Sequence, residues 1–149
     1  MKKIIKKTAI VLFVIFLIIQ FIPTKINQST EILSTDFTKR YEVPNNIQTM
    51  LKTSCYDCHS NNTKYPWYNK IQPVAWFLEN HIKEAKEELN FSEFGSYSPK
   101  KQNHKLDEII DEVKEGKMPL KSYKIMHSDA KFSDKERKEF LEYFNKLMN

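Results

Sequence analysis

The sequence predicts an all-helical protein: an apolar N-terminal helix followed by one small helical domain. Four stretches carry apolar residues at the spacing of an amphipathic helix, and none shows sustained strand alternation. The chain has two glycines in 149 residues, which is few for the tight hairpins of a sheet-rich fold. A chain of this length is typical of a single domain.

Residues 1–23 are predicted to form a membrane anchor or an export signal. Residues 9–22 are apolar except for Gln20, and they cover roughly 21 Å of a hydrocarbon core about 30 Å thick. Because no small-x-small cleavage site follows, we expect an uncleaved anchor, with a cleaved signal as the alternative. The lysines at the N-terminus place the rest of the chain on the extracytoplasmic side of the cytoplasmic membrane. These are Lys2, Lys3, Lys6 and Lys7.

The net charge of +5 belongs to the N-terminal segment and not to the domain. Residues 1–30 hold five of the 24 basic residues and no acidic residue, so residues 31–149 carry 19 bases and 19 acids. No basic patch interleaved with aromatic residues is evident, and we therefore expect no nucleic-acid partner.

Residues 24–43 are polar and patternless, and we expect a flexible tether there, with the domain following over residues 44–149. The alternative is that this segment belongs to the domain, because Ile32, Leu33 and Phe37 are able to pack against it.

Four helices are predicted in the domain. Proline opens the first two, over residues 44–53 and 73–89. The third, over residues 99–115, ends at Gly116, a C-terminal cap residue. The fourth opens with Ser133 and Glu136, which form a capping box. The apolar faces comprise Ile47, Met50 and Leu51; Val74, Leu78, Ile82, Ala85 and Leu89; Leu106, Ile109, Ile110 and Val113; and Phe140, Leu141, Phe144 and Leu147.

The only two cysteines form the motif CYDCH with a histidine, over residues 55–59. A redox dithiol is disfavoured because Asp57 would raise the pKa of a neighbouring thiol. A structural zinc site needs further ligands at a suitable spacing, which the other histidines lack. A disulfide between Cys55 and Cys58 closes a very short loop, gains little chain entropy and leaves His59 unexplained.

The pattern C-x-x-C-H is the signature of covalent haem attachment. One helical turn separates the thiols so that both reach one porphyrin edge, and the next residue turns its imidazole under the iron. The pattern therefore predicts one haem c per chain, bonded to Cys55 and Cys58, with His59 as an iron ligand.

Around this motif the chain resembles a small bacterial haem-binding domain family. The resemblance rests on "CYDCHSNNTKYPWYNKIQPVAWFLENHIKEAKEELNFSEF", "EIIDEVKEGKMP" and "YKIMHSDAKFSDKERKEFLEYF", and it covers about residues 44–146. It implies a cytochrome-c-like helical fold wrapped around haem, with Cys55 and Cys58 as thioether sites and His59 as the proximal ligand. "MPLKSY" departs from the second proline expected after Met118 and Pro119.

The second axial ligand decides between an open, ligand-binding iron and a closed, electron-transferring one. Met118 is the leading candidate, because it follows a helix stop and Pro119 stiffens the loop that presents its thioether. His127 and His81 are alternative ligands. A further alternative is that the iron has no second protein ligand. Met118 otherwise fills a gap in the core.

Aromatic residues soon after His59 are candidates to wall the haem. They are Tyr65, Trp67 and Trp76, whose other reading is an ordinary aromatic core. The carbonyl of Pro66 or Pro73 is expected to accept a hydrogen bond from the His59 ring.

These observations predict a membrane-tethered monohaem c-type cytochrome that transfers single electrons to transient protein partners and is not itself an enzyme. One alternative is a haem sensor or peroxide-handling domain with a displaceable sixth ligand. The other is a haem-free thiol or zinc module.

Overall fold

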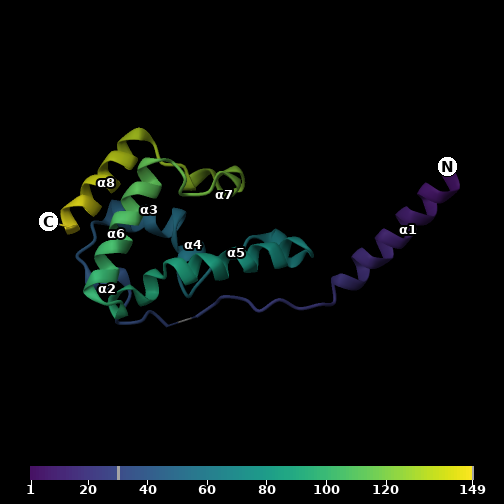
Figure 1. Ribbon diagram of the computed structural model, residues 1–149, viewed down its shortest axis with the longest axis horizontal. Helices are drawn as coiled ribbons and strands as arrows, with labels where there is room; N and C mark the ends of the chain where they lie inside the picture. The colour runs from purple at the N-terminus through teal and green to yellow at the C-terminus, as the bar shows by residue number, and fades with distance from the viewer. Residues whose placement is uncertain (30, 149) are drawn as a thin grey trace.

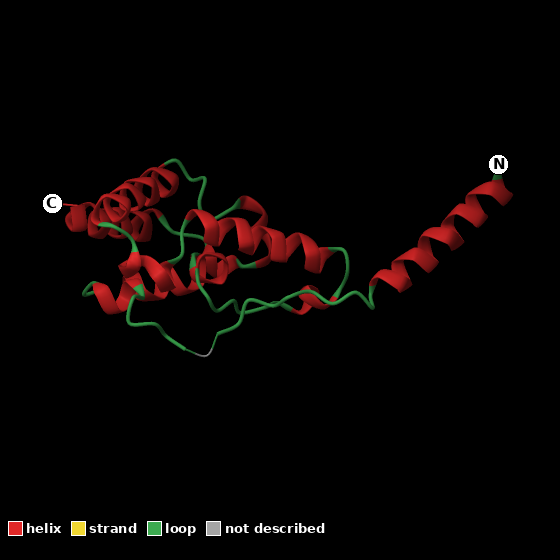
Figure 2. Ribbon diagram, turned by 60° about the horizontal axis from the view of Figure 1, so that its bottom comes forward, coloured by secondary structure: helices red, strands yellow, loops and turns green. Residues whose placement is uncertain are grey.

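The computed structural model describes residues 1–29 and 31–148. All regular structure within these ranges is helical, and no strand occurs among them (Figure 2). The predicted all-helical fold class is therefore confirmed.

The N-terminal helix α1, Lys2–Ile19, extends away from the rest of the chain (Figure 1). None of its residues is buried. Among the described residues, no helix has both the length and the apolar character that crossing a membrane requires.

The four predicted domain helices are present, with boundaries close to those expected. They are α3, Asn45–Ser54; α5, Val74–Glu88; α6, Pro99–Lys114; and α8, Asp134–Met148. The capping box of α8 forms as predicted, since the Ser133 N–H donates to Glu136 Oε2 at 2.8 Å and the Glu136 N–H donates to Ser133 Oγ at 3.3 Å.

Six short elements connect these helices, and periodicity does not predict them because each is at most two turns long. Three are α-helical: α2, Phe37–Arg40; α4, Tyr56–His59; and α7, Lys121–Met126. Three are 3-10 turns: η1, Trp67–Lys70; η2, Phe91–Ser96; and η3, Ser128–Ala130.

The core lies where α3, α6 and α8 meet, on the side of the molecule away from α1 (Figure 1). The predicted apolar faces supply most of it. Fully or nearly fully buried members of these faces are Ile47, Leu51, Leu106, Val113, Phe140 and Phe144. Five phenylalanines with at most 1 % exposure dominate its volume: Phe37, Phe91, Phe94, Phe140 and Phe144.

Part of the segment expected to be a tether packs into the domain, because Phe37 lies at the centre of the core. Its ring stacks on Phe144 with 5.6 Å between centroids and meets Phe91 and Phe94 edge to face. The N–H of Gly95 donates to the Thr35 carbonyl at 2.7 Å, and a Cβ at residue 95 would lie only 3.0 Å from that oxygen. This matches the alternative in which the segment packs against the domain.

We predict that Phe37→Ala destabilises the protein by about 3–5 kcal/mol, because it removes a fully buried ring and leaves a cavity. Denaturant unfolding of the purified protein measures this change. Ile32→Ala, in the same segment but at a side chain that is 71 % exposed, is the matched control and should stay within about 0.5 kcal/mol of the parent. Equal stability of the two variants would mean that the segment does not contribute to the core.

Candidate functional site

One helical turn brings the two cysteines and the histidine together. Cys55 ends α3 and precedes α4, and its carbonyl accepts hydrogen bonds from the N–H groups of Cys58, at 3.2 Å, and His59, at 2.9 Å. Both thiols are free and partly buried. The change of direction at Cys55, between two consecutive helices, places the motif where α3, α5 and η2 approach each other.

Two backbone carbonyls at the end of α5 fix the orientation of the His59 ring. Nδ1 lies 3.0 Å from the oxygens of both Ala85 and Leu89. Because a carbonyl only accepts hydrogen bonds, Nδ1 carries the proton and Nε2 keeps its lone pair. Metal-binding histidines have this arrangement. The carbonyls come from α5 and not from Pro66 or Pro73 as expected.

Burial lowers the pKa of His59. The two carbonyl hydrogen bonds raise this pKa by less, and the charge of Lys105 lowers it further. The ring is therefore held in its neutral form, which is the form that binds a metal ion.

A cavity of about 420 Å³ brings His59 together with Cys55 and Met118. This volume lies within the range of small-molecule and cofactor sites. Leu89, Phe91, Ile109, Val113 and Phe140 make much of its wall apolar. Cys58 does not line the cavity.

The end of α6 places Met118. Gly116 adopts a left-handed conformation with φ of 71°, and the N–H groups of Lys117 and Met118 both donate to the Glu112 carbonyl, at 3.0 and 3.1 Å. This is how helices commonly end at glycine, and Gly116 is the cap residue predicted from the sequence. Met118 therefore lies directly after the glycine-capped end of α6.

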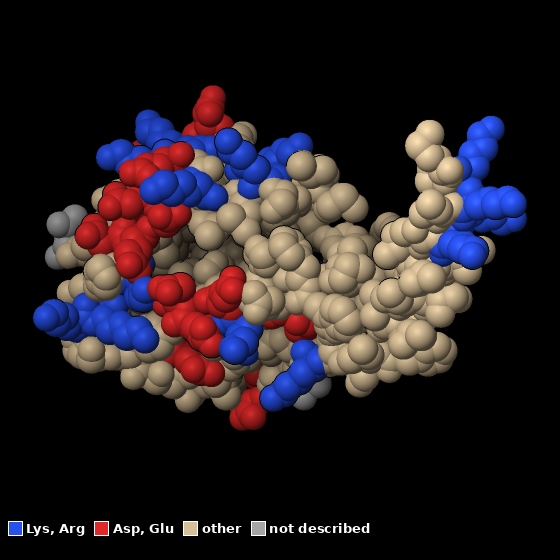
Figure 3. Space-filling model, turned by 45° about the vertical axis from the view of Figure 1, so that its right-hand side comes forward, with Lys and Arg blue, Asp and Glu red and all other residues tan. Residues whose placement is uncertain are grey.

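Charged groups surround the apolar wall of the cavity. Its lining contains five carboxylates and two lysines: Glu88, Glu108, Asp111, Glu112, Glu115, Lys105 and Lys117. Figure 3 shows acidic side chains gathered beside a hollow in the surface. The side chain of Lys105 is only 11 % exposed, and its Nζ lies 2.6 Å from Glu108 and 3.6 Å from Glu88.

The other two candidate axial ligands do not line this cavity. His127 Nε2 lies 3.2 Å from the Tyr68 hydroxyl, and its ring stacks on Tyr123 at 4.2 Å. His81 lies on α5, where its Nδ1 is 3.0 Å from the carbonyl of Phe77. Of the three sequence candidates, only Met118 shares a cavity with His59.

The three aromatic residues expected to wall the haem lie elsewhere. Tyr65 accepts a hydrogen bond from the Asn27 N–H at 2.6 Å, and Trp67 is 71 % exposed. Trp76 lines a separate groove beside residues 23–27. The aromatic residues that do line the cavity are Phe91 and Phe140. Phe91 belongs to the "LNFSEF" stretch, which was the available sequence signal for it.

Both cysteines have the electrostatic properties of unreactive thiols. The pKa of Cys55 is raised from 9.0 to about 12, mainly by burial and to a smaller extent by the neighbouring Cys58. The pKa of Cys58 is raised to about 11, mainly by burial and to a smaller extent by the charge of Asp57. A catalytic redox thiol needs a lowered pKa. In addition, no cluster of three or more His, Cys, Asp or Glu residues suited to a metal ion occurs in the described part of the chain. The raised thiol pKa values count against the redox-dithiol alternative.

The chain belongs to the haem-binding domain family, whose model matches residues 14–146. The match begins before the region of the resemblance seen in the sequence and includes the segment that carries Phe37 into the core. No curated protein and no solved structure matches the chain. Family membership makes haem the ligand of this domain, and the neutral, oriented imidazole of His59 fits that group.

In the haem-free folded chain, we predict that Cys58 reacts with iodoacetamide about 100-fold more slowly at pH 8 than an unperturbed thiol. A rise of about two units in pKa lowers the thiolate fraction by that factor. Alkylation followed by mass spectrometry measures the rate, and the same chain unfolded in urea is the control. Equal rates in the folded and unfolded chain would contradict the burial of this thiol.

Proposed function

We propose that this protein is a monohaem c-type cytochrome that transfers single electrons. The observation that carries the proposal is the His59 imidazole, whose Nδ1 is held by two carbonyls while the residue lines a cavity shared with Cys55 and Met118. When bound, the haem supplies an iron that gains and loses one electron. The residues of the chain bind and orient this group and exclude water from it.

In this proposal Cys55 and Cys58 hold the haem through thioether bonds. Support comes from the spacing of the motif, from the two free thiols and from the family of the chain. The placement of Cys58 rests on the motif alone, because Cys55 is the only one of the two that lines the cavity.

Met118 is proposed as the second axial ligand, so that the iron has no open position. The end of α6 holds its backbone, and Pro119 next to it is buried. A thioether ligand favours reduced iron and raises its reduction potential. Both properties suit an electron carrier better than a gas sensor or a peroxide-handling site.

Lys105 is proposed to pair with a carboxylate of the haem. It is the more buried of the two lysines on the cavity wall, and a buried charge is costly unless it is paired. Glu88 is its more distant partner in the structure, at 3.6 Å, and is itself largely exposed. A haem carboxylate is thus able to replace Glu88 at the Lys105 ammonium without leaving a buried carboxylate unpaired.

The domain is proposed to work on the extracytoplasmic side of the cytoplasmic membrane, retained there by the N-terminal segment. Lysines precede the apolar part of α1, and none of the residues of this helix is buried. Redox partners would dock transiently on the domain.

We predict that the mature protein carries the mass of one haem and has no free thiol. Mass spectrometry of protein exported by a host with cytochrome maturation measures both. Cys55→Ala and Cys58→Ala should each lose one thioether bond, whereas Lys52→Ala, at an exposed residue shortly before the motif and outside the cavity, should leave both intact. Exported protein without haem and with two free thiols would exclude this function.

We also predict that Met118→Ala opens the iron to carbon monoxide, because it removes the sulfur ligand. The visible spectrum of the reduced protein with carbon monoxide should change rapidly in this variant and slowly in the parent. Met126→Ala is the matched control, since Met126 is 56 % exposed and does not line the cavity. A parent that binds carbon monoxide as fast as the variant would favour the sensor or peroxide-handling alternative.

A further inference from the structure

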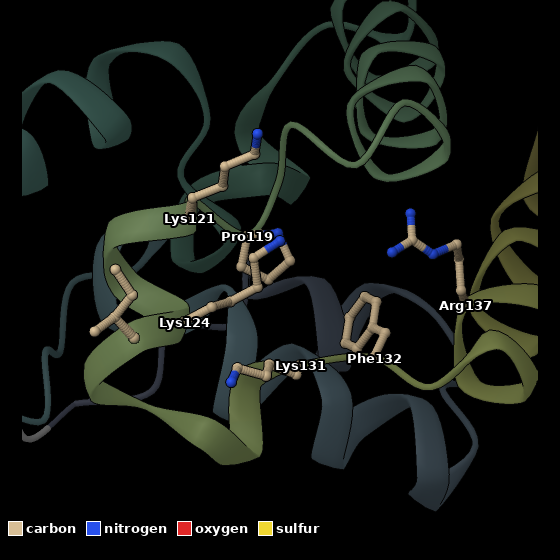
Figure 4. A pocket seen from close by; sticks show the side chains of 7 residues that line it. Pro119, Lys121, Lys124, Lys131, Phe132 and Arg137 are labelled. Carbon is tan, nitrogen blue, oxygen red and sulfur yellow. The ribbon is translucent and has the colours of Figure 1, made fainter.

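A second hollow, of about 330 Å³, lies beside α7 and is lined by basic residues (Figure 4). Four cationic side chains line it: Lys121, Lys124, Lys131 and Arg137. The remaining lining residues are the apolar Pro119, Ile125 and Phe132. We call this surface the basic groove. It contains no acidic residue, in contrast to the haem cavity.

The positive charge of the basic groove is not neutralised within the protein. None of its four cations forms an ion pair with a carboxylate of the described residues, whereas five lysines elsewhere in the domain do: Lys83, Lys105, Lys117, Lys135 and Lys138. Arg137 is held in place by a hydrogen bond from its Nη1 to the Val113 carbonyl, at 3.0 Å. These charges are therefore available to an anionic partner.

An exposed apolar residue accompanies these charges. Ile125 is 78 % exposed, on the same short helix as Lys121 and Lys124. Protein docking surfaces typically combine apolar side chains with polar and charged ones. In Figure 4 the side chains around Pro119 come from α7, from the segment before α8 and from α8 itself, and together they line the hollow. A concave basic surface suits a protruding acidic segment of a protein.

The basic groove is adjacent in the chain to the proposed sulfur ligand. Met118 lines the haem cavity and Pro119 lines the basic groove, so a single peptide bond joins the two sites. We propose that the basic groove docks the acidic surface of a one-electron redox protein, which this geometry brings next to the Met118 loop. The proposal rests on the proposed function. One electron passes between the haem iron and the redox centre of the partner, so that one is oxidised as the other is reduced.

Charge complementarity of this kind steers association and weakens as salt is added. Because residues 31–149 have no net charge, binding of an anion to the domain requires a local cluster and not the overall charge. The basic groove is such a cluster.

The test uses the full-length holoprotein in detergent and a fluorescent peptide of roughly eight glutamates as the acidic probe, with binding measured by anisotropy at low salt. Lys121→Glu combined with Lys124→Glu should weaken binding about 10-fold or more. Lys39→Glu combined with Lys100→Glu is the matched control. It changes the net charge equally at two exposed lysines outside the groove, and it should weaken binding less than about 3-fold.

A second measurement links docking to electron transfer. The glutamate peptide should slow the oxidation of the reduced parent by ferricyanide, and it should not slow that of the groove variant. Equal loss of peptide binding in both double variants, or no binding by the parent, would overturn the proposal. Binding to anionic phospholipid vesicles without binding to the peptide would also overturn it, in favour of a lipid surface.

The haem spectrum of each variant separates this proposal from the proposed function. A parent without haem fails the proposed function, whatever the peptide result. A parent with normal haem that does not bind the peptide fails the docking proposal alone.

Discussion

The hydrogen bonds from the His59 ring to the end of α5 are the interaction on which the site depends. In proteins, a histidine that binds a metal through one nitrogen almost always donates a hydrogen bond from the other, which fixes the tautomer and the ring plane. Here two carbonyls at 3.0 Å do both. Ala85 belongs to α5, a helix of 15 residues, and Leu89 is its C-cap, so the orientation of the His59 ring is set by this long helix and not by the short α4 that carries the residue. The other parts of the fold keep α4 and α5 in fixed positions relative to each other.

The hydrophobic core helps to hold α4 and α5 in these relative positions. The aromatic cluster joins α2, η2 and α8, and Phe91 of this cluster also lines the cavity that contains His59, where the two rings meet edge to face at 6.4 Å. Phe37 therefore acts on the cavity through Phe91, although it lies 22 positions before His59 in the chain. A small domain has a limited apolar interior of its own, and in this one Phe37 from a distant N-terminal segment helps to complete it.

Much of the fold follows from local sequence signals. Helices α3, α5, α6 and α8 were predictable because each spans several turns with a clear apolar face or a cap, as at Gly116 and Ser133. The motif of residues 55–59 and Met118 stood out in the sequence because chemistry restricts their spacing and context, and the structure brings Cys55, His59 and Met118 to one cavity. Trp67 and Trp76 were assigned to the haem wall only from proximity in sequence, and proximity does not determine which face of a turn a side chain occupies. Ala85 and Leu89 act through backbone carbonyls, which carry no side-chain signal, and Lys105 appears as an ordinary charge until α6 is placed against the cavity.

The left-handed backbone of Gly116 has a consequence for how this protein is able to vary. A residue with a Cβ is strained at that φ, and straightening the turn would redirect the chain at the point where Met118 and Pro119 separate two surfaces of opposite charge. The position of the Met118 side chain and the relation of the acidic surface to the basic one thus both depend on a residue that has no side chain.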